Sequence, residues 1–325
     1  MSQATKSPQE PAKAAKRAPA KKGKPPKRAK QGLLGLEQKR NLTGWTFLIP
    51  AALLITVMSF WPMFKAFQLS LQIGKNKLEY ADPLWYNYVR LFTKDKTFIL
   101  TMKNTFLYLI IQVPIMLVLA LILAYLLNKK DLRCRALFRT AIFLPCAISL
   151  VSYSMVFRTM FAKEGLVNDV LVGLNLLNEP INWLNEPNAA RAVIILGLLW
   201  RWTGYNMIFY LAGLQNLDYA TFEAAKIDGA GPIQTFLHVT IPQLRPMILL
   251  TAIMSTNGTL QLFDESYALT GGGPSHQTQT MSHYLFEVSF KNNSNFGYAS
   301  AISFAILVMV AVLALIQMRV GDKRD

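Results

Sequence analysis

Six long apolar stretches restrict the fold of this chain more than any other feature of its sequence. Three contain no charged residue and are long enough, at about 20 residues, to cross a hydrocarbon core of roughly 30 Å as helices; they cover residues 45–64, 105–127 and 298–318. Three further stretches carry polar interruptions and cover residues 136–157, 192–214 and 243–263. We therefore predict an all-α integral membrane protein with six transmembrane helices within residues 45–320.

The two ends of the chain differ in character from these stretches. Residues 1–44 hold 12 Lys or Arg and only two Glu, in a Lys/Ala/Pro-rich composition that buries too little apolar surface to fold. We expect a disordered basic tail that lies in the cytoplasm and is attracted to anionic membrane lipid. The tail contains no aromatic residue for base stacking, so we expect no nucleic-acid partner. Residues 321–325 form a short C-terminus.

The distribution of basic residues predicts the orientation in the membrane. The tail and the short 128–139 connection are both rich in Lys and Arg, which favour the cytoplasmic side. A six-helix count places both of them on one side, so both termini are expected in the cytoplasm of a multi-pass protein of the cell membrane. Residues 73–103, 161–190 and 266–297 then lie outside, where a soluble partner could dock.

A short polar segment separates the fourth and fifth apolar stretches. Asp218 or Thr221 is a suitable N-cap for two helical turns over 222–228, and Gly229 can end that helix in the left-handed conformation. Pro232 suits the start of a second helix, which we expect Pro242 and Pro246 to stop before the chain restarts as a membrane span. Because so short a helix is unstable alone, it is expected to have a docking partner.

The sequence of this segment, "EAAKIDGAG…HVTIPQLRP", resembles the EAA loop of binding-protein-dependent ABC importers. The family spacing is filled by Glu223, Ala224, Ala225, Gly229, Val239, Ile241 and Pro242. The stretches "FRTAIFLPCAISL", "NMIFYLAGLQ" and "ALTGGGPSHQTQT" are similar to sugar-importer permeases of the maltose and glycerol-phosphate type, in particular to the first permease subunit of the maltose type. The segment departs from the family at Leu217 and Asp218, where Ile-Pro is usual.

The resemblance implies a type I ABC importer permease fold in which 216–246 is the coupling loop. Glu223, Ala224, Ala225, Gly229 and Pro242 would then contact a cytoplasmic ATPase. The implied partners are a second permease subunit, a dimer of ABC ATPases that binds ATP and Mg²⁺, and an extracellular or periplasmic solute-binding protein. The implied function is import of a mono-, di- or oligosaccharide by alternating access.

Polar residues inside two of the spans are candidates for the solute pathway. The fifth span contains Ser255 and Thr259 on one helical stripe and Asn257, Gln261 and Asp264 on another. In the fourth span, Arg201 lies between two Trp residues and is followed by Tyr205 and Asn206. These side chains could line the pathway or only join neighbouring helices by hydrogen bonds.

Arg201 is the charged residue within these spans that most needs an explanation, because an intramembrane Arg requires an anionic partner or access to the interface. Asp264 and Glu265 are the candidate partners, in a gate or a structural ion pair. The side chain could instead extend along the helix to the outer membrane surface.

The sequence favours transport without chemistry in this chain. It contains no G-x-x-x-x-G-K-[ST] loop for nucleotide phosphates, so ATP hydrolysis is expected on a separate subunit. We expect no catalytic residue, metal site or cofactor: Cys134 and Cys146 lack metal-ligand spacing, and His276 and His283 are expected to be solvated in a loop. A transporter driven by an ion gradient, with Arg201 and Asp264 as charge relay, is the alternative, and a membrane enzyme is a weaker one.

Overall fold

The computed structural model describes residues 36–74, 79–129, 132–291 and 294–321. Most of the predicted tail (1–35) and residues 322–325 lie outside these ranges, so their expected disorder and location stay predictions. The chain divides into two units, one up to Phe60 and one from Trp61 onward. Each unit is described by itself.

The first unit is a helix, α1 (Leu36–Ile55), followed by a π-helical turn, η1 (Thr56–Phe60). The predicted boundary of the tail at residue 44 is therefore wrong, because residues 36–44 are already helical. Leu36, Glu37, Gln38, Lys39 and Arg40 are strong helix formers, and this explains why the helix begins before the apolar stretch.

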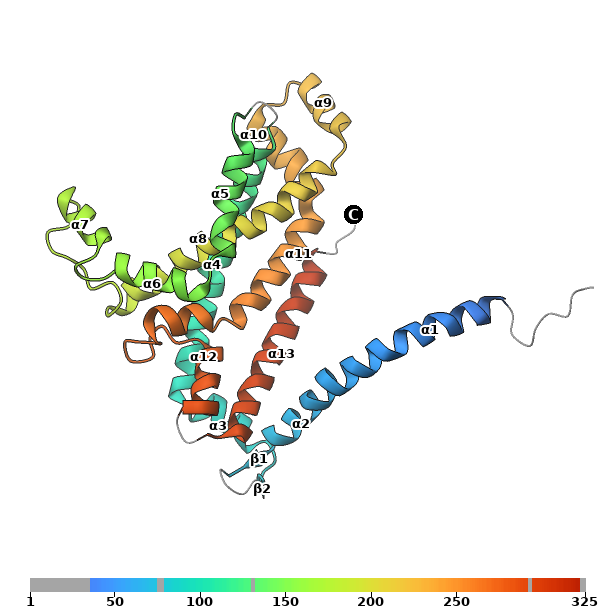
Figure 1. Cartoon of the computed structure of the whole chain (residues 1–325), viewed down its shortest axis with the longest axis vertical. Coiled ribbons are helices and arrows are strands. Elements are labelled where there is room, and N and C mark those ends of the chain that lie inside the picture. The colour runs from blue at the N-terminus through green and yellow to red at the C-terminus, as the bar shows by residue number, and fades with distance from the viewer. Residues whose placement is uncertain (1–35, 75–78, 130–131, 292–293, 322–325) are drawn as a thin grey trace, which may run out of the picture. The chain divides into compact units, whose positions relative to one another are not determined.

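The second unit is a helical bundle with one small hairpin. Long helices α4, α8, α11 and α13 lie against one another, with α5 against α8 and α2 against α13 (Figure 1). Strands β1 (Gln72–Ile73) and β2 (Glu79–Tyr80) pair antiparallel. The helices are α2 (Trp61–Ser70), α3 (Tyr86–Thr93), α4 (Lys96–Asn128), α5 (Arg135–Ala147), α6 (Leu150–Met160), α7 (Leu166–Gly173), α8 (Pro187–Gln215), α9 (Tyr219–Ile227), α10 (Pro232–Thr235), η2 (Phe236–Thr240), α11 (Ile241–Leu260), η3 (Ser266–Thr270), α12 (Met281–Phe286), η4 (Glu287–Lys291) and α13 (Phe296–Gly321).

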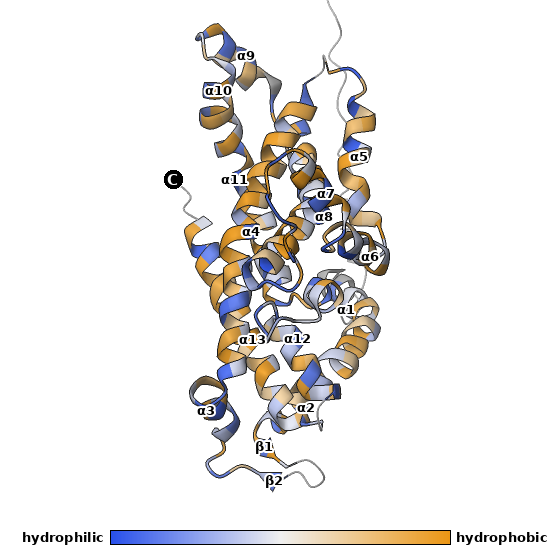
Figure 2. Ribbon diagram, turned by 90° about the vertical axis from the view of Figure 1, so that its left-hand side faces the viewer, coloured by the Kyte–Doolittle hydropathy of each residue, from blue (hydrophilic) through white to orange (hydrophobic). Residues whose placement is uncertain are grey.

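The two ends of this bundle carry different elements. Helices α9 and α10 lie at one end, while α3 and the hairpin lie at the opposite end (Figure 1). Apolar residues dominate the middle of α4, α11 and α13, and polar residues are more frequent at α9 and in the connections (Figure 2). This distribution is expected for helices that cross a membrane and end in water.

Small residues allow the long helices to pack closely. A side chain at Gly204 in α8 would place its Cβ in collision with the Ile142 carbonyl oxygen of α5. A side chain at Gly213 would place its Cβ 2.8 Å from Leu244 of α11. Close approach at small residues is a common means by which membrane helices associate. The position of α8 between α5 and α11 therefore depends on these two glycines.

The prediction of six spans is correct for five of the apolar stretches and needs a correction for the stretch at 136–157. Five helices in the described part of the chain are long and apolar enough to cross a membrane, and a sixth span requires α5 and α6 to be counted together. These two helices are bent by 97°. The bend lies at Ile148 and Ser149, whose backbones are extended (ψ 140° and 135°). Pro145 weakens the last turn of α5 because it has no N–H to donate.

The chain from Pro232 to Leu260 is continuously helical, so the expected break at Pro242 and Pro246 is wrong. A proline ring crowds the carbonyl four residues before it. For Pro242 that carbonyl belongs to His238, within η2. The wider π-helical turn gives the ring room, so the helix continues into α11.

Candidate functional site

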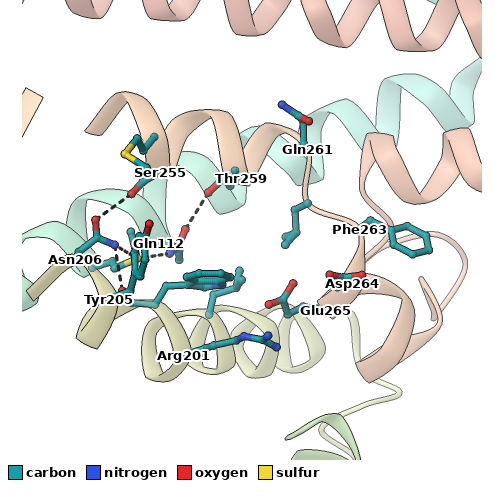
Figure 3. Close-up of a pocket in the computed structure, with 16 residues that line it drawn as sticks. Gln112, Arg201, Tyr205, Asn206, Ser255, Thr259, Gln261, Phe263, Asp264 and Glu265 are labelled. Atoms are coloured by element: carbon teal, nitrogen blue, oxygen red, sulfur yellow. Dashed lines mark hydrogen bonds between the residues drawn. The ribbon is translucent and has the colours of Figure 1, made fainter. Parts of the chain in front are cut away.

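A cavity of about 350 Å³ lies between α4, α8, α11 and the turn that follows α11 (Figure 3). Most of its wall is apolar, and we call it the polar cavity because hydroxyl, amide and charged groups are grouped among its lining residues. Its shape and mixed polar and aromatic lining suit a small polar solute. The lining residues are Gln112, Met116, Leu198, Arg201, Trp202, Tyr205, Asn206, Met254, Ser255, Gly258, Thr259, Gln261, Leu262, Phe263, Asp264 and Glu265.

The structure brings together all but one of the residues that the sequence suggested for a solute pathway. The residues at the cavity are Arg201, Tyr205, Asn206, Ser255, Thr259, Gln261 and Asp264. Asn257 does not line it; this side chain is exposed on α11 and accepts a hydrogen bond from Gln261. Helix α11 ends at Leu260, so residues 261–265 turn across the cavity instead of continuing the helical stripe that contains Asn257.

Uncharged polar side chains form one end of the cavity, where three helices meet. Ser255 of α11 donates to Asn206 Oδ1 of α8 over 3.5 Å, and Thr259 donates to Gln112 Oε1 of α4 over 3.3 Å. Gln112 Nε2 has the Met116 sulfur as its acceptor, at 3.1 Å. These hydrogen bonds are long or made to a weak acceptor, so hydroxyl groups of a solute could replace them at little cost.

Charged side chains form the other end. Figure 3 shows the Arg201 side chain close to Glu265, with Asp264 on the same side of the cavity. Arg201 Nε and Nη1 are buried and have no hydrogen-bond partner. The ion pairs within 4.0 Å in the described ranges do not include Arg201. The guanidinium carbon lies 5.5 Å from each of the Tyr153 and Trp202 rings. The guanidinium is thus held inside the protein and does not extend outward along the helix into solvent.

Four lining residues with evident chemistry were not identified from the sequence as pathway candidates. Gln112 and Met116 lie in α4, an apolar stretch in which the Gln112 amide is the sequence feature that could have indicated a site. Trp202 follows Arg201, and its ring lies 5.8 Å from the Tyr205 ring. Glu265 had been considered only as a partner for Arg201. The sequence signal that could have identified Gln112 is its polar side chain within an apolar span, because a polar group in a membrane is costly unless it has a structural or functional role.

A second polar region lies at the end of the bundle opposite α9, and we call it the loop network. It consists of Asn104, Arg191, Ser266, His283 and the 276–279 part of the Gly-rich loop. Asn104 Nδ2 donates to the carbonyls of His276 and Gln279, each over 3.0 Å. Arg191 Nη2 donates to Asn104 Oδ1 (3.0 Å) and Gln277 Oε1 (2.7 Å), and its Nε donates to the Gln277 carbonyl (2.9 Å).

His283 belongs to this network, so the expectation that it is solvated is wrong. Its side chain is fully buried in α12, and Nδ1 lies 2.9 Å from the Ser266 hydroxyl, which donates to the Thr278 carbonyl over 3.0 Å. Burial is the main cause that lowers the pKa of His283 to about 4, while the nearby Glu287 carboxylate raises it. His276, in contrast, is exposed as expected.

The segment with the EAA sequence forms α9 as predicted. Asp218 caps the helix by accepting from Ala220 N–H over 3.0 Å, and Gly229 ends it with a φ of +80°, which favours glycine. Glu223 and Ala224 are exposed, and Ile227 is 86% exposed. Ile233 (75% exposed) in α10 and Leu237 (50% exposed) in η2 are also exposed near this end of the bundle, and a group of large exposed apolar side chains suits a protein partner.

Apolar helices around a polar cavity, with an exposed short helix at one end, define a membrane permease. The family model described as the binding-protein-dependent transport system inner membrane component matches residues 103–323. The chain belongs to this family and is a sugar ABC transport permease, an integral membrane subunit of an importer that moves a carbohydrate.

Individual relatives agree with this assignment. The chain is 46% identical to the lactose transport system permease protein LacF of Rhizobium radiobacter, over 89% of this chain and 97% of that protein. It is 31% identical to the arabinooligosaccharides transport system permease protein AraP of Halalkalibacterium halodurans, over 86% and 87%. The fold matches a crystal structure of a bacterial ABC transporter involved in alginate import with a TM-score of 0.76, at 22% identity over 88% and 96%. None of these relatives supports the alternative of an ion-gradient-driven transporter.

Proposed function

We propose that the carbohydrate passes through the polar cavity and that lactose or a related disaccharide is the solute. The observation that carries this proposal is the cavity itself, which collects hydroxyl, amide and aromatic groups from three helices that are far apart in sequence. Trp202 and Tyr205 offer ring faces for a sugar, and Ser255, Thr259 and Asn206 offer donors and acceptors. The identity of 46% to a lactose permease supports the choice of disaccharide.

Helix α9 is proposed to couple this subunit to a separate ATPase. Glu223, Ala224, Ala225 and Gly229 would dock in a groove of the ATPase, and Pro242 would help to set the direction of the helix that leads back into the membrane. The exposure of Glu223 and Ala224 and the positive φ of Gly229 support this role. The ATPase dimer would bind ATP and Mg²⁺, and this subunit would hydrolyse none itself.

The full assembly is proposed to contain a second permease subunit, two ATPases and a solute-binding protein outside the cell membrane. The binding protein would dock on the end of the bundle that carries α3 and the hairpin, opposite α9. Both termini would lie in the cytoplasm, with the basic tail near anionic lipid headgroups. Closure of the ATPases would then open the cavity alternately to each side.

The test is uptake of radiolabelled lactose by the complete importer in proteoliposomes, with binding protein and ATP supplied. We expect ATP-dependent uptake by the wild type. Glu223→Lys and Gly229→Pro are expected to abolish uptake and to prevent co-purification of the ATPase. Glu164→Lys, the same charge change at an exposed position far along the chain from α9, is the matched control for ATPase binding and should co-purify with the ATPase as wild type does. Full uptake and ATPase binding in both α9 variants would overturn the coupling role.

A further inference from the structure

The charged end of the cavity has a composition that suits some solutes and opposes others. Arg201, Asp264 and Glu265 are the charged residues among those that line it, so carboxylates outnumber cations. Glu265 is only 3% exposed, whereas Asp264 is exposed at the cavity edge. A buried carboxylate interacts with a neighbouring charge much more strongly than a solvated one. Of the two carboxylates, Glu265 therefore interacts more strongly with a charged group that enters next to it, while Arg201 beside it acts with the opposite sign.

The Arg201 guanidinium adds an unused set of donors at the same place. Its Nε and Nη1 are buried without an acceptor, which is costly unless something supplies one. The Tyr153 and Trp202 rings, at 5.5 Å, offset part of that cost through cation–π attraction but accept no hydrogen bond in the plane of the guanidinium. Because Arg201 lines the cavity, a solute that displaces its neighbours there would supply the missing acceptor.

We propose that Arg201 and Glu265 determine specificity by binding hydroxyl groups of an uncharged sugar and excluding sugars that carry a carboxylate or phosphate. A hydroxyl both donates and accepts, so it can accept from Arg201 and donate to Glu265. A carboxylate or phosphate accepts only. It would satisfy Arg201 but would meet repulsion from Glu265, with a smaller contribution from the more exposed Asp264.

This inference rests on the proposed role of the cavity. It predicts that Arg201 and Glu265 have opposite effects on the affinity for an acidic sugar relative to an uncharged one. Removing the Glu265 charge should remove the repulsion and let an acidic sugar bind. Removing the Arg201 charge should weaken the binding of any sugar and should weaken the binding of an acidic sugar still further. A site that binds anions would behave differently, because in such a site removing the Glu265 charge would not change the relative affinity for acidic and uncharged sugars.

The experiment measures sugar binding to the importer in nanodiscs, with its ATPase subunits and a non-hydrolysable ATP analogue but without binding protein. The probes are lactose and lactobionate, its aldonic acid, followed by tryptophan fluorescence. Like charges in close contact disfavour binding, so we expect wild type to bind lactobionate at least about tenfold more weakly than lactose. Glu265→Gln should narrow that gap to about threefold or less, and Arg201→Gln should widen it.

Asp264→Asn is the matched control, since it removes the same charge from an exposed neighbour, and it should shift the ratio less than Glu265→Gln does. Equal affinity of wild type for both probes, or an unchanged ratio in Glu265→Gln, would overturn the inference. So would an absence of lactose binding in a preparation that transports lactose. Failure of lactose uptake by the complete importer is a separate result that counts against the proposed function.

Discussion

The loop network and the cavity are both rich in polar side chains, but Asn104 and Arg191 of the network are more completely hydrogen-bonded than Arg201, Ser255 and Thr259 of the cavity. In the loop network, Asn104 and Arg191 make hydrogen bonds of 2.7–3.0 Å to the Gly-rich loop. In the cavity, the bonds of Ser255 and Thr259 are 3.5 and 3.3 Å, and two Arg201 nitrogens have no partner. A permease needs a fixed framework around a site whose contacts can change, and this chain places the two in different regions.

The largest expected effect comes from breaking the loop network at Asn104. This residue is 1% exposed, donates to two loop carbonyls and accepts from Arg191. Asn104→Leu leaves these buried groups unpaired, so we expect a loss of about 3 kcal/mol in stability. The measurement is the apparent melting temperature of the purified protein in detergent. Asn188→Leu, an exposed Asn with one long bond to Arg191, is the control and should change little. Equal melting temperatures of the two variants would contradict the conclusion that the buried bonds of Asn104 hold the loop network together.

The next effect concerns pH and His283. Burial lowers the pKa of His283 from 6.5 to about 4, with Lys291 and His276 acting in the same direction and Glu287 opposing them. Because the folded state prefers the neutral ring, its contribution to stability is complete above pH 6.5 and is lost as the pH falls towards 4. The melting temperature should therefore fall more steeply between pH 7 and 4.5 in wild type than in His283→Gln. Parallel pH profiles would show that this ring does not report on the network.

A smaller effect on stability, with a clear effect on transport, is expected at Gln112. Its bonds to Thr259 and Met116 are weak, so replacing it by Leu should change the stability by no more than about 1 kcal/mol. Loss of one hydrogen-bonding group for the sugar should reduce uptake about tenfold. Melting temperature and uptake in proteoliposomes are measured on the same preparation. A drop in melting temperature as large as that of Asn104→Leu would remove the distinction between the two regions.

The smallest effect is expected at Asn257, which lies on the same helix as Ser255 and Thr259 but is exposed. Asn257→Ala should leave uptake within about twofold of wild type and stability within about 0.5 kcal/mol. Uptake and melting temperature are again the measurements. A loss of uptake like that of Gln112→Leu would show that this face of α11 also meets the solute.

Much of the architecture could be predicted because the membrane imposes a simple rule of length and hydropathy. The apolar stretches at 105–127 and 298–318 became α4 and α13, and the caps at Asp218 and Gly229 defined α9. The 97° bend after α5 could not be predicted, because Pro145 is compatible with both a mild kink and a break. The chain breaks and does not merely kink because Ile148 and Ser149 have an extended backbone, and that conformation depends on the packing around them.

The site was predicted only as far as single helices allow. Polar residues in the fourth and fifth spans identified Arg201, Ser255 and Thr259, since such residues are costly in a membrane. Asn257 was included because it is polar and shares a helical stripe with Gln261 and Asp264, but only those two reach the cavity, through the turn that follows Leu260. Gln112 and the burial of His283 were missed because both depend on which helices meet, and one sequence without contacts does not contain that information.

The uninterrupted helix from Pro232 to Leu260 has a mechanical consequence. Its 29 residues form a rod about 43 Å long. Tyr125 holds the rod at its beginning through a 3.2 Å bond to the Pro232 carbonyl, and Gln317 holds it further along through a 2.8 Å bond to Thr256. The backbone stays helical past Pro242, so a push at the Gly231–Pro232 corner meets no break in the chain before Leu260. Ser255 and Thr259 lie on the same helix, so a partner that moved its beginning would, under the proposed function, act on the wall of the cavity through one continuous element.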